Sequence, residues 1–197
     1  MTFTIINKHY KALVFITALA GCTFSSTDNL PTGMHTAKDT AFTSGYAEVN
    51  GIKMYYEIHG EGKPLVLVHG GGSTIATNYG NILPLFAQHY KVIAMELQAH
   101  GRTADRDAPE SFEQDADDVA ALLQQLGISK AYVLGFSNGG NTTMQLAVRH
   151  PELAAKLVIV SSFYQREGLF PGFFDMMKTA SLDNMPKPLQ QGFLEVN

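Results

Sequence analysis

The chain has 197 residues, 45% of them hydrophobic, and a formal net charge of −4. That length gives room for one domain with a substantial core. The acidic balance argues against a nucleic-acid binder, which carries a basic patch. The single cysteine excludes an internal disulfide framework and any metal site built from several cysteines. We therefore expect one globular domain with no nucleic-acid partner and no bound metal.

Residues 1–21 have the pattern of a secretory signal peptide. Lys8 and Lys11 are followed by the short apolar run ALVFITALA, and no acidic residue precedes this run. The run is too short to cross a bilayer, which takes about 20 apolar residues. It continues directly into Gly and then Cys22, the only cysteine of the chain.

The Leu-Ala-Gly-Cys22 sequence resembles the lipobox of bacterial lipoproteins, in which the cysteine is acylated. This resemblance implies lipid attachment at Cys22 and a protein anchored to a membrane of the bacterial cell envelope. The alternative is an ordinary cleaved signal peptide, which implies a secreted or periplasmic protein. Residues 22–45 are rich in Ser and Thr and poor in large apolar residues, which predicts a tether. The folded domain is then expected to begin at Tyr46.

From Tyr46 onward, strand patterns alternate with helix patterns. Alternating or continuous apolar residues predict strands over 46–50, 52–58, 65–68, 92–95, 131–136 and 157–160. Helices are predicted over 78–89, from the capping pair Ser111 and Gln114 to Gly127, and over 138–150. A hairpin followed by strand–helix units predicts an α/β fold with a mostly parallel sheet and helices on both faces. We expect the core of this fold to span residues 46–162.

One strand-to-helix turn carries a nucleophile motif. Gly135-Phe136-Ser137-Asn138-Gly139 matches G-x-S-x-G between an apolar strand and a helix, which is the context that a nucleophile elbow requires. The tight turn holds the Ser137 hydroxyl above the sheet, and the start of the following helix directs free N–H groups toward an oxyanion. The alternative is a glycine-rich turn with an incidental serine.

An earlier turn carries a glycine run, His69-Gly70-Gly71-Gly72. Glycines allow the backbone to approach a substrate closely and to present N–H donors. A phosphate cradle would need a G-x-x-x-x-G-K-[ST] pattern, which is missing from this turn. Glycines that serve only a tight turn are the simpler alternative. His69 itself is expected to be a structural hydrogen-bonding residue rather than a base.

Together, these two turns resemble the α/β-hydrolase family from about Tyr46 to the end of the chain. The resemblance implies Ser137 as the nucleophile, the backbone N–H groups of Gly71 and Asn138 as the oxyanion hole, a small-molecule substrate and no cofactor. The segment ELQAHGR at 96–102 is similar to the family's D-x-x-G-x-G loop. Glu and Ala stand there in place of the usual Asp and the first Gly.

The family's remaining catalytic residues, an acid and then a histidine, are expected after the nucleophile. The only histidine after Ser137 is His150, at the far end of a predicted helix, roughly 18 Å from the elbow. Residues 163–197 contain apolar residues interrupted by prolines, which is typical of the start of a cap or lid. We therefore expect the acid and the histidine to lie beyond Asn197, in a longer hydrolase of which this chain is the front part.

Three functional hypotheses follow. The first is an envelope-anchored serine hydrolase acting on small esters, lactones or related carbonyl compounds, impaired in this chain because it lacks a base. The second is a cofactor-free perhydrolase or haloperoxidase, which resembles the same scaffold and uses the same triad. The third is a lipoprotein that has kept the fold without catalysis.

Overall fold

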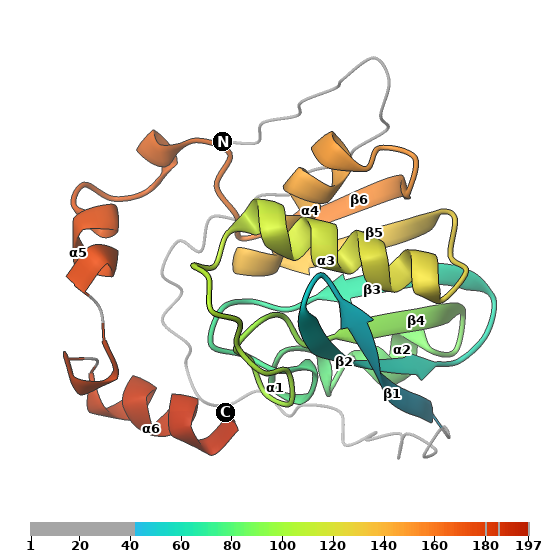
Figure 1. Cartoon of the computed structure of the whole chain (residues 1–197), viewed down its shortest axis with the longest axis horizontal. Helices are drawn as coiled ribbons and strands as arrows, with labels where there is room; N and C mark the ends of the chain where they lie inside the picture. Colours follow the sequence, from blue (N-terminus) through green and yellow to red (C-terminus); the bar gives the residue numbers. More distant parts are fainter. Residues whose placement is uncertain (1–41, 180, 185, 197) are drawn as a thin grey trace, which may run out of the picture.

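The computed structural model describes residues 42–179, 181–184 and 186–196 (Figure 1). The predicted signal peptide at 1–21, Cys22 and most of the predicted tether lie outside these residues. Strand β1 (Phe42–Val49) begins inside the segment assigned to the tether, earlier than the expected start at Tyr46. The Phe42 ring stacks on His59 with ring centroids 4.5 Å apart, so the strand pairing extends into a stretch whose Ser and Thr content had concealed it. No helix in the described part of the chain is long and apolar enough to span a membrane.

The described strands form one sheet in the order β1-β2-β4-β3-β5-β6. Strand β2 (Ile52–His59) is antiparallel both to β1 and to β4 (Tyr90–Met95). Strands β4, β3 (Lys63–Val68), β5 (Ala131–Phe136) and β6 (Ala154–Val160) run parallel to one another. The predicted hairpin and mostly parallel sheet are thus confirmed.

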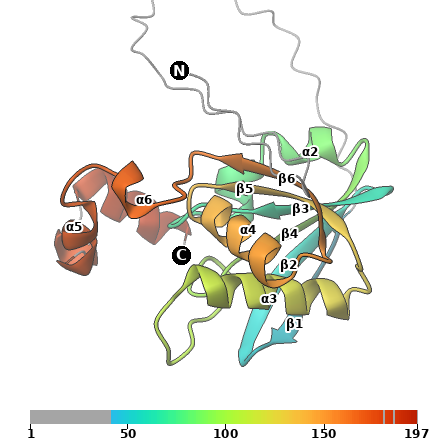
Figure 2. The ribbon, with the colours of Figure 1, turned by 90° about the horizontal axis from the view of Figure 1, so that it is seen from above.

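Helices cover the two faces of this sheet (Figure 2). On one face, α3 (Phe112–Gln125) and α4 (Asn138–Arg149) enclose a core that includes Met54, Val66, Leu123 and Leu146. On the other face, α1 (Ile75–Tyr79) and α2 (Leu83–Phe86) enclose a second, smaller core. This layering places the turns that connect parallel strands to the following helices at the carboxyl-terminal ends of those strands.

The single helix predicted over 78–89 is wrong, because two short helices stand in its place. Gly80 caps α1, and Pro84 occupies the first turn of α2. Proline has no N–H to donate, so a helix accepts it readily in its first turn and poorly in its interior. As a result Ile82 and Leu85 are 40% and 58% exposed. The predicted start of α3 is correct, since the Ser111 hydroxyl accepts a hydrogen bond from the Gln114 N–H at 3.1 Å.

After β6 the chain leaves the sheet. It forms the short helices η1 (Arg166–Gly168), α5 (Phe173–Thr179), η2 (Leu182–Asn184) and α6 (Lys187–Val196), which lie beside the core in Figure 1. Strand β6 is the terminal strand of the described sheet and pairs only with β5. Val158 on this strand is 45% exposed, as expected for an apolar strand at an open edge.

Candidate active site

Ser137 occupies a strained turn between β5 and α4. Its backbone angles are φ 52° and ψ −116°, in a region that residues with a side chain rarely adopt. Two glycines make the turn possible. A Cβ atom at Gly135 would overlap the carbonyl oxygen of Gly139, and a Cβ atom at Gly139 would overlap the carbonyl oxygen of Val68. The packing of β3, β5 and α4 against one another therefore requires the glycines of the G-x-S-x-G motif.

His69 braces the glycine turn that follows β3. Its Nε2 accepts a hydrogen bond from the Leu97 N–H at 3.0 Å, so Nδ1 carries the proton and donates to the Gly70 carbonyl at 2.7 Å. The ring is fully buried, and this burial lowers the pKa of His69 to about 4. A neutral histidine with both nitrogens engaged is a structural residue, as the sequence suggested.

Two further side chains, Asn78 and His100, hold the glycine turn, and no sequence motif marks either as part of the site. The Gly70 N–H donates to Asn78 Oδ1 at 2.7 Å, and the Gly72 N–H donates to His100 Nε2 at 2.9 Å. His100 is itself oriented because its Nδ1 donates to the Gln98 carbonyl at 2.7 Å. The amides on either side of Gly71 are thus occupied by side chains.

Gly71 and Asn138 lie side by side with free N–H groups. A Cβ atom at Gly71 would lie 3.6 Å from Asn138 Cβ, in ordinary van der Waals contact. Neither backbone N–H donates to another residue in the described part of the chain. Asn138 is also the first residue of α4, at the positive end of the helix dipole. Two adjacent preorganised donors beside a serine are the arrangement that stabilises a developing oxyanion.

The loop after β4, at 96–102, forms its turn although Glu96 and Ala99 differ from the family pattern. Burial alone would raise the pKa of Glu96, but hydrogen bonds from Arg102 outweigh it and lower that pKa. These bonds come from the Arg102 backbone N–H at 2.7 Å and from its Nη2 at 2.6 Å. Ala99 takes φ 58°, a left-handed conformation that glycine adopts more easily. The longer acid and the alanine are therefore accommodated without loss of the turn.

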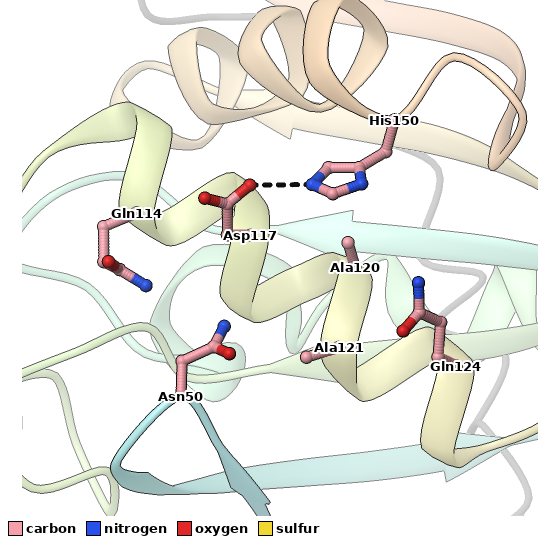
Figure 3. Close-up of a pocket in the computed structure, with 7 residues that line it drawn as sticks. All are labelled: Asn50, Gln114, Asp117, Ala120, Ala121, Gln124 and His150. Carbon is pink, nitrogen blue, oxygen red and sulfur yellow. Dashed lines mark hydrogen bonds and ion pairs between the residues drawn. The ribbon is translucent and has the colours of Figure 1, made fainter.

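His150 has a partner away from the elbow. It caps the far end of α4, and its Nε2 lies 2.7 Å from Asp117 on α3. Both residues line a shallow pocket of about 480 Å³ on the outer side of α3, together with Asn50 and Gln124 (Figure 3). In the described residues, neither an acid nor a histidine is hydrogen-bonded to the Ser137 hydroxyl.

Aromatic rings join the segment after β6 to the core. Phe163 makes an edge-to-face contact with Phe112, at the start of α3, with ring centroids 6.1 Å apart. Phe174 on α5 makes a similar contact with Phe163 at 6.0 Å, and the Arg166 guanidinium lies over the Phe174 ring. Helix α5 is thereby linked through Phe163 to the start of α3, while Phe170 and Met176 are exposed.

Comparison with known proteins agrees with this geometry. The family model described as the alpha/beta hydrolase fold matches residues 63–189, so the chain belongs to the α/β hydrolase family. Over 127 residues it is 30% identical to 2-hydroxy-6-oxo-6-(2'-aminophenyl)hexa-2,4-dienoic acid hydrolase of Metapseudomonas resinovorans, covering 63% of this chain and 44% of that protein. Over 171 residues it is 32% identical to the human serine hydrolase BPHL, covering 82% of this chain and 58% of that protein.

A solved structure shows the same likeness. The enzyme Est816, described as an N-acyl homoserine lactone degrading enzyme, superposes with a TM-score of 0.63 at 28% identity, covering 76% of this chain and 64% of that one. The chain spans about half the length of the curated relatives that it matches.

Proposed function

We propose that this chain is the nucleophile-bearing and oxyanion-binding part of a serine hydrolase that acts on small esters, lactones or related carbonyl compounds. The observation that supports it best is the strained Ser137 beside two free N–H groups, those of Gly71 and Asn138. The substrate class rests on the relatives, which include a hydrolase of an oxo acid and a lactone-degrading enzyme.

In this mechanism Ser137 Oγ attacks the carbonyl carbon, and the C=O electron pair moves onto the oxygen. The N–H groups of Gly71 and Asn138 stabilise that oxyanion. The oxyanion then collapses, the alcohol leaves with a proton, and an acyl-serine remains until water hydrolyses it. A base must accept the Ser137 proton and a group must donate one to the alcohol. In the α/β-hydrolase family the acid and the histidine that supply these functions follow the nucleophile in the chain.

An activated-ester assay on three proteins tests this function. They are this chain, its Ser137→Ala variant, and a form extended by the downstream coding sequence. We expect the extended form to be fastest, because an oxyanion hole and substrate binding without the triad retain only about 10³–10⁴-fold acceleration over water. This chain should fall in that residual range, and Ser137→Ala should be slower still. Equal rates for all three would overturn the serine mechanism.

Attachment to a membrane is a separate part of the proposal. The position of Cys22 directly after the signal-like apolar segment supports an acylated N-terminus in a bacterial envelope. The intact mass of the protein isolated from its native host tests it. We expect the mass of a chain that begins at acylated Cys22. The mass of a chain that begins at Met1 or at unmodified Thr23 would contradict lipid attachment.

A further inference from the structure

The backbone of Ser137 is hydrogen-bonded to the end of β6 and to the residues that directly follow it. Phe136 pairs with Val160 in the parallel β5–β6 register, which brings the residues after each strand together. The Ser137 N–H donates to the Val160 carbonyl at 2.8 Å. The Ser162 hydroxyl lies 2.9 Å from the Ser137 carbonyl oxygen. Both peptide groups that flank the Ser137 Cα are therefore tied to the same neighbouring segment.

The Ser162 hydroxyl has one proton and two nearby carbonyl oxygens. The Ser137 carbonyl is the closer one, because the Val160 carbonyl lies 3.2 Å away. Space for this hydroxyl depends on Gly140 in the first turn of α4, where a Cβ atom would overlap Ser162 Oγ. Gly140 and Ser162 therefore pack directly against each other, next to Ser137.

We propose that Ser162 is a positioning residue for the oxyanion hole, an inference that rests on the serine hydrolase function proposed above. The Ser137 carbonyl and the Asn138 N–H belong to one planar peptide group, and they point in opposite directions. A hydrogen bond at the carbonyl therefore fixes the direction of the N–H. It also polarises the peptide, which makes that N–H a stronger donor.

The strain at Ser137 is the reason why this bond matters. Its backbone conformation is unfavourable, so the peptide rotates toward a relaxed geometry unless its neighbours hold it. The Gly140 and Asn141 N–H groups also donate to the Ser137 carbonyl, at 3.0 and 3.2 Å, but they belong to α4 and move with it. Ser162 adds a donor from outside the helix and so fixes the peptide relative to the sheet.

Ser162→Ala removes the hydroxyl, and Ser161→Ala is its matched control because the neighbouring Ser161 is exposed. In the extended form of the protein we expect Ser162→Ala to lower kcat for an activated ester about tenfold. This loss is less than the 10²–10³-fold cost of removing an oxyanion donor, since the N–H remains but is misdirected. KM should stay within about twofold, because the interaction is made in the transition state. A rise in KM alone, or an equal loss in Ser161→Ala, would overturn the proposal.

The amide resonance of Asn138 provides a readout that does not need activity. Its ¹H–¹⁵N chemical shift should move in Ser162→Ala and stay in place in Ser161→Ala. An unmoved resonance would refute the positioning role whatever the rates. If Ser137→Ala instead proved as active as the parent protein, the hydrolase function would fail, and the Asn138 shift would still decide whether Ser162 orients the peptide.

Discussion

Asp115, in the first turn of α3, is a buried carboxyl group, and no cationic side chain in the described part of the chain is hydrogen-bonded to it. Burial, together with the nearby charges of Glu110 and Asp118, raises its pKa to about 7, against a weak hydrogen bond from Thr142 at 3.4 Å. The folded state therefore holds a proton that the unfolded state releases near its usual pKa of 3.8. Because of this difference, folding stability is lost as the pH rises from about 4 to about 7.

Asp115→Asn should remove this dependence. An amide carries no charge in either state, so the variant should be more stable than the parent at pH 8 and nearly equal to it at pH 4. A gain of 1–2 kcal/mol would correspond to roughly 2–8 °C in the melting temperature of a domain of this size. Thermal unfolding at both pH values measures it, with the exposed Asp107→Asn as the control. A gain of equal size at pH 4 would contradict the titration of Asp115.

At the scale of elements, the turn at Ser137 depends on how closely β5 and α4 approach. A Cβ atom at Gly135 would meet backbone atoms of Gly139 and the Thr143 hydroxyl, and backbone cannot move aside as the end of a flexible side chain can. The Thr143 hydroxyl already donates to the Gly139 carbonyl at 2.7 Å. This junction therefore has no room for one additional carbon atom.

Gly135→Ala should accordingly destabilise the fold by about 1–3 kcal/mol, the usual cost of overpacking. Gly192→Ala in α6 is the matched control. A Cβ atom there meets nothing within 4 Å, and alanine favours a helix over glycine by about 1 kcal/mol. Urea unfolding should therefore show a lower free energy of unfolding for Gly135→Ala and a higher one for Gly192→Ala. Similar midpoints for both would show that the β5–α4 junction can expand.

Features carried by a short continuous stretch could be predicted from the sequence. A short local pattern is enough to predict the strand before Ser137, the helix after it, the glycine turn at 70–72 and the Ser111 cap. The side chains that hold these turns could not be predicted in the same way. His100 contacts Gly72 from 28 residues away, and Ser162 contacts Ser137 from 25 residues away. Such contacts depend on strand register and loop path, which residue patterns do not encode.

At the scale of the whole molecule, the described sheet has an open side at β6. Leu134 pairs with Val158 and Phe136 with Val160, so these side chains share the face that α1 and α2 cover elsewhere. Val158 and Phe136 are exposed on this face. An apolar strand with free N–H and C=O groups along one edge is a template for pairing with another chain.

Val158→Lys should therefore reduce self-association of this chain. A charge on an edge strand opposes pairing between two edges, while the lysine stem still covers part of the sheet. Light scattering during incubation at 37 °C should rise more slowly than for the parent chain. Val148→Lys provides the control, since Val148 is exposed on α4 and is not part of a strand. Equal suppression by both variants would attribute the effect to net charge rather than to the β6 edge.

The bond between Ser137 and Val160 also bears on the order in which the protein matures during synthesis. The turn at Ser137 takes its contacts from β3 through Val68, from its own helix, and from the end of β6. A nascent chain released only as far as α4 has no acceptor for the Ser137 N–H and no Ser162 hydroxyl for its carbonyl. Without those contacts only α4 and β3 restrain the strained conformation. The turn at Ser137 therefore gains its full set of backbone contacts only after β6 has joined the sheet, so chains that stop before β6 carry Ser137 with fewer restraints on its conformation.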